Sequence, residues 1–158
     1  MKVPWSKPKD FCSVVKSNIP RDAYPADREA REACNNALDI FCRGWDSLAL
    51  RSNWDGDIGE MKRMACVVLL LSCEKHNSRL PILVMRQIAS HYPQSGLAWY
   101  CVACACIALG DKGDPQEFVE SVKKAYTLGC DYVRKGDNGE LVIRLVQHPE
   151  IGMSLAIA

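Results

Sequence analysis

The residues of this chain best suited to chemistry are three closely spaced cysteines, Cys101, Cys104 and Cys106. Thiolates bind zinc and other soft metals, and thiols also carry redox chemistry. On a continuous helix, Cys104 and Cys106 are separated by about 200° of rotation, and no Gly or Pro between Cys101 and Cys106 breaks the helix. The pattern therefore favours small apolar residues packed in a helix. We predict no bound metal and no other cofactor.

A second candidate metal site is the sequence Asn53-x-Asp55-x-Asp57, which places oxygen ligands at alternate positions as the start of a calcium loop does. An EF-hand loop also requires Gly at its sixth position and Glu at its twelfth. Ile58 and Met64 stand there instead. The segment is therefore predicted to be a solvated turn that caps the following helix.

The groups required for catalysis are not recognisable. The three histidines, His76, His91 and His148, each stand at a predicted helix end, where interaction with the helix dipole explains them. The sequence contains no phosphate-binding Walker loop, no G-x-S-x-G elbow and no H-E-x-x-H zinc motif. We predict that the protein is not an enzyme.

The amino-acid composition limits the classes of partner and the cellular compartment that we expect. Lys and Arg total 20, Asp and Glu total 19, and the net charge of +1 does not favour nucleic acid. The longest apolar run, 97–109, is shorter than the roughly 20 residues that span a bilayer, and residues 1–20 lack a signal-like apolar core. Nine cysteines, an odd number without a secretion signal, indicate free thiols in a reducing cytoplasm.

The periodicity of apolar residues predicts a single all-helical domain over 1–158. Apolar residues recur at three- and four-residue steps, and no alternating run suggests a sheet. The segment 1–25 is irregular apart from one short helix. The predicted helices are 10–16, 26–48, 60–75, 81–91, 97–109 and 115–128, followed after a polar link (131–139) by two short helices, 140–147 and 149–157.

The second half of the chain resembles tetratricopeptide (TPR) repeats, which are helical hairpins of about 34 residues. Pro93, Trp99 and Gly110 stand at the spacing of that family, and Ala103 occupies the small position where its helices cross. Residues 139–150 resemble the helical tail that terminates such arrays. A weaker repeat covers 62–95, so the resemblance spans 62–150.

The resemblance implies an all-α fold of helical hairpins stacked as a short right-handed array, with an additional N-terminal helix. It also implies a non-catalytic module that binds another protein or a peptide on its concave face. Trp99 is expected to pack between the hairpins. The groove-facing positions carried over from the family are Arg63, Cys66, Leu70, Cys73, Leu97, Tyr100, Cys104 and Ile107.

Several alternatives stay open at this point. The apolar groove suits an amphipathic helix from a partner, or the chain's own helix over 26–48 fills it. One alternative function is a bacterial accessory protein that acts by occlusion, as toxin-immunity proteins and secretion chaperones do. A second alternative is a cysteine-based metal or redox protein. The oligomeric state is not predicted.

Overall fold

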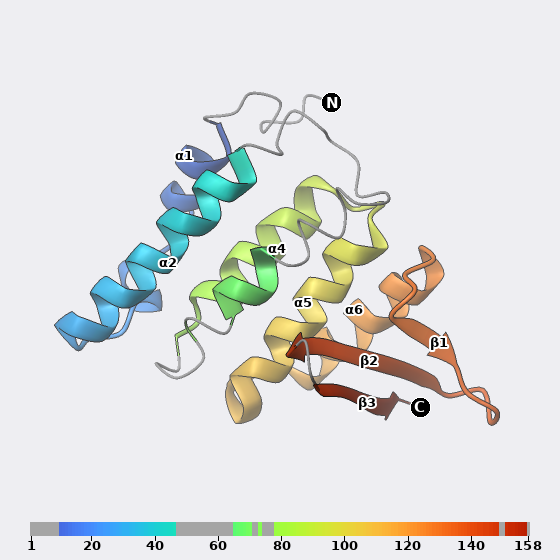
Figure 1. The fold of residues 1–158 in the computed structure, drawn as a ribbon. Helices are drawn as coiled ribbons and strands as arrows, with labels where there is room; N and C mark the ends of the chain where they lie inside the picture. The colour runs from blue at the N-terminus through green and yellow to red at the C-terminus, as the bar shows by residue number, and fades with distance from the viewer. Residues whose placement is uncertain (1–9, 47–64, 71–72, 74–77, 149–150, 158) are drawn as a thin grey trace.

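The computed structural model describes residues 10–46, 65–70, 73, 78–148 and 151–157 of the 158-residue chain. Helices come first and strands last in this part of the chain (Figure 1). The helices are α1 (Asp10–Ser17), α2 (Arg28–Asp46), α4 (Leu80–His91), α5 (Gly96–Leu109) and α6 (Pro115–Thr127), with 3₁₀ turns η1 (Arg21–Ala23) and η2 (Gly110–Lys112). Residues 65–70 are also helical. The strands are β1 (Val133–Lys135), β2 (Leu141–His148) and β3 (Ile151–Ile157).

Helices α5 and α6 begin at capping residues. The side chains of Ser95 and Asp114 accept hydrogen bonds from Ala98 N–H and Gln116 N–H at the starts of α5 and α6. Caps of this kind stabilise a helix by about 1 kcal/mol. Gly110 ends α5 with a φ of 58°, a backbone conformation that side chains other than Gly rarely adopt. The helices predicted over 10–16, 81–91, 97–109 and 115–128 are confirmed, as are the described parts of 26–48 and 60–75.

The prediction of an all-α domain is wrong for the C-terminal region, although the described chain is mostly helical. The segment predicted as a helix over 140–147 and the described part of 149–157 are strands, and β1 lies inside the predicted polar link. The three strands form an antiparallel sheet in the order β1-β2-β3. Within the segment 139–150, where a helical tail was expected, residues 141–148 form strand β2 instead.

The physical reason lies in the sequence of β3, which alternates large apolar residues with small ones. Ile151, Met153, Leu155 and Ile157 alternate with Gly152, Ser154 and Ala156. A two-residue period gives a strand one apolar face, whereas a helix would distribute the same residues around its axis. The register confirms the period, because Leu155 stands opposite Ile143, which is fully buried.

One continuous hydrophobic core connects the helices to the sheet. It includes Val15 of α1, Leu38 and Trp45 of α2, and Ile143 of β2. Helix α5 is central, as predicted, since every residue from 100 to 106 is buried. Figure 1 shows α1 and α2 on one side of the molecule and the sheet on the other, with α4 and α5 between them. The described chain contains no helix both long and apolar enough to cross a membrane.

Helices α5 and α6 pack against each other as a hairpin, and α4 packs against α5. Trp99 is only half-buried, and it packs against the core from the side. Its indole N–H donates to the carbonyl oxygen of Pro93 at 2.9 Å, and the ammonium group of Lys124 lies 4.1 Å from its ring centroid. Trp99 thus links the start of α5 to both the preceding turn and α6.

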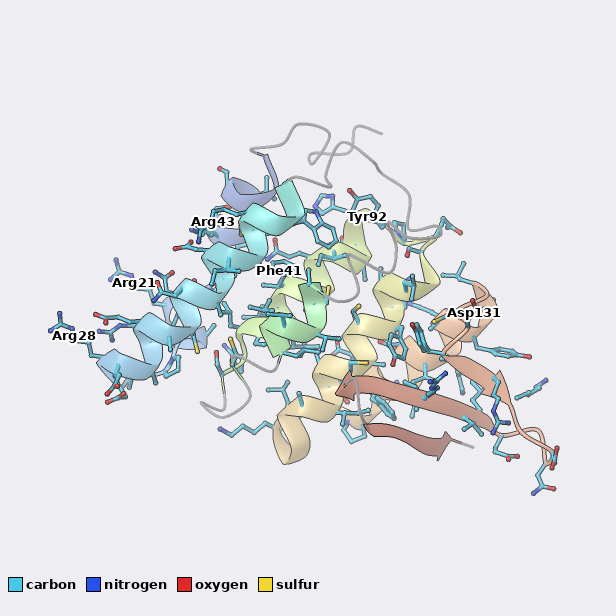
Figure 2. All side chains as sticks on the ribbon, in the orientation of Figure 1. Arg21, Arg28, Phe41, Arg43, Tyr92 and Asp131 are labelled. Carbon is cyan, nitrogen blue, oxygen red and sulfur yellow. The ribbon has the colours of Figure 1, made fainter. Side chains whose placement is uncertain are left out.

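Polar contacts join the N-terminal helices to α4. The amide of Gln87 on α4 donates to the carbonyl oxygen of Val15 at 3.3 Å. The hydroxyl of Ser78 donates to the carbonyl oxygen of Ala23 and accepts from the N–H of Leu80. Figure 2 shows Arg21, Arg28 and Arg43 on the outer side of the α1–α2 end of the molecule. Leu38, Phe41 and Cys42 of α2 face the core, whereas Ile40 is exposed.

Candidate functional site

Most of the predicted groove-facing residues are buried in the chain's own core. Cys66, Leu70, Cys73, Tyr100 and Cys104 are each at most 2% exposed, which leaves no surface for a partner. Leu97 and Ile107 are half-buried against the same core. Arg63 lies outside the described residues. As folded here, the proposed concave face is occupied from within.

Two different elements cover this face. Cys73 lies in hydrogen-bonding contact with Cys34 of α2, and burial raises the pKa of the Cys73 thiol. Tyr100 stacks on Tyr132 with 4.9 Å between ring centroids, and its hydroxyl donates to the backbone carbonyl of Arg144 in β2. Helix α2 therefore covers one part, in line with the self-filling alternative, and the C-terminal sheet covers another.

The cysteines form a buried set without a metal-binding arrangement among the described residues. Eight of them are free thiols and all eight are buried, which confirms the predicted burial for those positions. Helix α5 runs without a break through Cys101, Cys104 and Cys106, as the continuous-helix argument requires. In the parts of the chain that are described, no three His, Cys, Asp or Glu side chains lie close enough to hold one metal ion. The Asn53–Asp57 turn lies outside those parts.

The most polar cluster near α5 is an ion pair between helices. Arg86 of α4 donates from Nε and Nη2 to the two carboxylate oxygens of Glu117 on α6, each at 2.7 Å. This hydrogen bonding raises the pKa of Arg86. Beside it, burial and then the charge of Glu117 raise the pKa of Cys106 to about 12. A thiol with that pKa stays protonated near neutral pH, so Cys106 is not prepared to act as a nucleophile.

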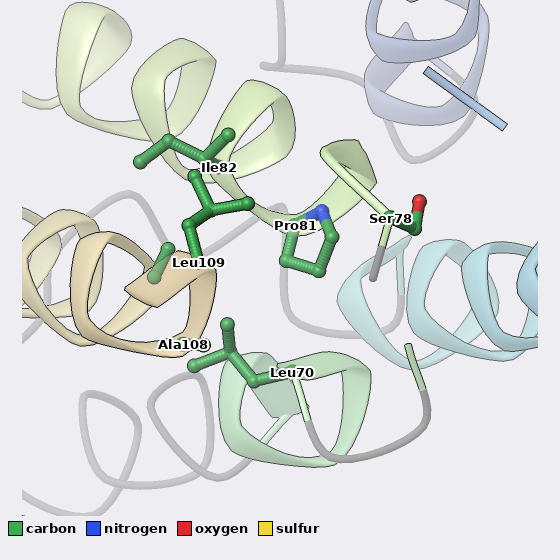
Figure 3. A pocket seen from close by; sticks show the side chains of 7 residues that line it. Leu70, Ser78, Pro81, Ile82, Ala108 and Leu109 are labelled. Atoms are coloured by element: carbon green, nitrogen blue, oxygen red, sulfur yellow. The ribbon is translucent and has the colours of Figure 1, made fainter. Parts of the chain in front are cut away.

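A small cavity lies between helical segment 65–70, α4 and α5 (Figure 3). Its volume is about 10 Å³, enough for about one water molecule. The walls are apolar except for Ser78, whose hydroxyl already bonds to the backbone of Ala23 and Leu80. The cavity is too small for a substrate or cofactor.

The outer edge of β3 is paired with no other strand among the described residues. Strand β2 is central in the sheet and pairs with β1 and β3, so β3 pairs on one side only with any described strand. In Figure 1, β3 runs along the margin of the molecule. A strand at a sheet edge presents a row of N–H and C=O groups that another extended chain can pair with.

The hydrogen-bond pattern identifies which backbone groups face outward. In an antiparallel sheet, N–H and C=O groups alternate between the two sides of each strand. Arg144 N–H donates to the carbonyl oxygen of Tyr132, so the backbone N–H and C=O groups of Arg144 point toward β1. The backbone groups of its neighbour Ile143 therefore point toward β3. Ile143 stands opposite Leu155 in register, so Leu155 is paired with β2. The N–H and C=O groups of Ser154 and Ala156 therefore point away from the sheet.

Sequence reasoning missed this edge because it predicted a helix over 149–157. The signal was present in the alternation of large apolar and small residues along β3. Comparison with known proteins gives the chain no relative: it matches no protein-family model, no curated protein and no solved structure.

Proposed function

We propose that the protein is a non-catalytic binding module that takes an extended segment of another protein onto the outer edge of β3. The observation that carries this proposal is the contrast between the two edges of the sheet. Strand β1 has only three residues, and two of them are Arg134 and Lys135. Strand β3 has seven residues and contains no Lys, Arg, Asp, Glu or Pro.

The contrast matters because proteins protect exposed strand edges. Short strands, charged residues and Pro prevent unwanted pairing, and the β1 edge has the first two of these features. The β3 edge has none of them. A strand added there would form main-chain hydrogen bonds with Ser154 and Ala156, and this mode of recognition gives affinity from the backbone alone.

The concave helical face is the weaker location for the same class of function. Tyr100 and Cys104 would have to leave the core before a partner could touch them, and Tyr100 is held there by Tyr132 and Arg144. Binding at the β3 edge requires no such opening. The protein- or peptide-binding function is therefore retained, and its proposed surface moves from the helices to the sheet.

Selection of random phage-displayed octapeptides on the folded protein tests the proposal. We expect the selected peptides to alternate large apolar residues with other residues, as strands do. Hydrogen exchange should show slower exchange at the Ser154 and Ala156 amides when a peptide is bound. Amphipathic peptides with a three- to four-residue period, or protection on the helices instead, would contradict the proposal.

A matched pair of variants at one position sharpens the test. Ser154→Ala keeps the outward N–H group, whereas Ser154→Pro removes it without touching a hydrogen bond to β2. We expect Ser154→Ala to bind the selected peptides like the wild type and Ser154→Pro to bind about ten-fold more weakly. Circular dichroism of both variants checks that the sheet is intact. Equal binding by the two would exclude strand addition at this edge.

A further inference from the structure

The charges on the solvent-facing side of the sheet specify what kind of strand fits beside β3. Arg134 of β1 and Arg144 of β2 are both exposed. Arg134 stands opposite Val142 in register, and Val142 and Arg144 are two residues apart on one strand, so all three share a face. The buried Val133 and Ile143 form the opposite face, against the helices. The outward face of β1 and β2 is therefore basic.

We infer that the partner segment is acidic, with Asp or Glu at alternate positions. This inference rests on the proposed strand addition and specifies the chemistry of its partner. Ser154 of β3 stands opposite Arg144, so a strand added beyond β3 would lie about 10 Å from β2, two strand spacings away. The long side chains of Arg144 and a Glu on the added strand can meet across the small residue Ser154.

The carboxylates of Asp131, Asp137 and Glu140 lie near this arginine in the described chain, but none forms a salt bridge with it. Asp137 and Glu140 lie at the hairpin between β1 and β2, and the Glu140 carboxylate accepts a hydrogen bond from Asn138 N–H in that turn. The hairpin adjoins the Leu141 end of β2, which pairs with Ile157 and not with Ser154. No carboxylate among the described residues forms a salt bridge with Arg144 or Arg134.

An acidic partner fits this edge better than a second copy of the chain. A second β3 would bring no Asp or Glu to the junction, because the strand contains neither. It would add another arginine-bearing sheet instead. Pairs of opposite charge across strands stabilise a sheet, and a second copy would offer Arg144 no such partner.

Two synthetic octapeptides test the inference, one alternating Val with Glu and the other alternating Val with Lys. Fluorescence anisotropy at low ionic strength measures their binding to the wild type, Arg144→Glu, Arg144→Gln and Ser154→Pro. We expect the wild type to bind the Glu peptide about ten-fold more tightly than the Lys peptide. Arg144→Gln should remove most of this preference and Arg144→Glu should reverse it. Ser154→Pro should weaken binding of both peptides.

The outcomes separate the inference from the proposed function. If both peptides bind equally and Ser154→Pro weakens both, strand addition holds and the acidic partner is wrong. If the Glu peptide is preferred but Ser154→Pro has no effect, the arginine side chains bind the acidic peptide without strand addition. The proposed function is then wrong. Absence of binding by either peptide at millimolar concentration would overturn both. A dimer in light scattering that Ser154→Pro dissociates would make a second copy the occupant.

Discussion

The helical part of the molecule and the C-terminal sheet satisfy their backbone hydrogen bonds in different ways. Helix α5 bonds its N–H and C=O groups within itself and is capped by Ser95 and Gly110 at its ends. Strand β3 can bond half of its groups to β2, and the groups of Ser154 and Ala156 face away. The backbone groups of a helix interior are paired within the helix, whereas those on a strand edge bond to water or to another strand.

This difference indicates that the helices provide most of the stability, whereas the sheet provides the proposed binding edge. The helices contribute most of the core, including the fully buried Trp45, Leu38 and Ile88. The sheet contributes fewer core residues, and its β3 edge pairs with no other strand in the described part of the chain. Tyr100 connects the two parts through its contacts with Tyr132 and Arg144. In the proposed function, the helical body is the support on which β3 is held.

The largest expected effect comes from cutting this connection. Tyr100→Ala should lower the free energy of unfolding by about 3–5 kcal/mol, the range for truncating a buried aromatic side chain. Tyr100→Phe keeps the ring and removes only the hydroxyl, so it should cost about 1 kcal/mol. Urea denaturation measures both. If Tyr100→Ala unfolds at nearly the wild-type urea concentration, the sheet is not anchored through this residue.

A Gly→Ala substitution should destabilise the protein more in the turn between α5 and α6 than in the turn between β1 and β2. A Cβ on Gly113 would lie 2.5 Å from the backbone carbonyl oxygen of Cys106, which the end of α5 holds in place. Gly113→Ala should therefore cost about 2 kcal/mol. A Cβ on Gly136 would meet the end of the flexible Glu140 side chain, so Gly136→Ala should cost about 0.5 kcal/mol or less. Equal losses of stability for the two variants in thermal denaturation would contradict this prediction.

Alkaline pH should weaken the helical part through its buried thiols. The folded state raises the pKa of Cys106 from 9.0 to about 12, so between these values the unfolded chain loses a proton that the folded chain keeps. Stability is then lost as pH rises, by about 1 kcal/mol per pH unit for this group. Cys106→Ala should have a shallower loss above pH 9.0 than the wild type. Chemical denaturation across this range gives the two slopes, and identical slopes would refute the assignment.

Weakening the ion pair between α4 and α6 should cost less than either Tyr100→Ala or Gly113→Ala. Arg86 is nearly half exposed, with 47% of its side-chain surface accessible, so solvent screens much of its attraction to Glu117. Arg86→Lys keeps the charge and loses the paired hydrogen bonds, and it should cost about 0.5–1 kcal/mol. Raising the salt concentration should reduce this difference. A loss as large as that of Tyr100→Ala would show that the pair is part of the core.

The sequence predicted the helices well because their signals are local. The apolar stripe of α2, Asp114 followed by Pro115, and Gly110 act within a few residues. The site was not predictable in the same way. Tyr100 was expected to face a groove, but residues 132 and 144, far along the chain, determine its neighbours. A hairpin pattern indicates which residues are apolar, and only the rest of the fold decides what covers them.

The sheet could have been predicted in part. The alternation along β3 and the β-branched Val142 and Ile143 of β2 both favour strands. The resemblance to a repeat array outweighed these signals, since a helical tail was expected over 139–150. The unpaired edge was beyond prediction from local pattern, because it depends on the strand order β1-β2-β3.

The buried free cysteines can serve as natural probes of local opening. Cys34 lies in α2, Cys66 in the helical segment 65–70, Cys101 in α5 and Cys130 just before β1, and all four are buried. An alkylating reagent can reach such a thiol only while its surroundings are open, so the rate of labelling reports the opening of that place. Mass spectrometry of labelled peptides would then give the labelling rate of each cysteine, and so the local opening of each region, without any substitution.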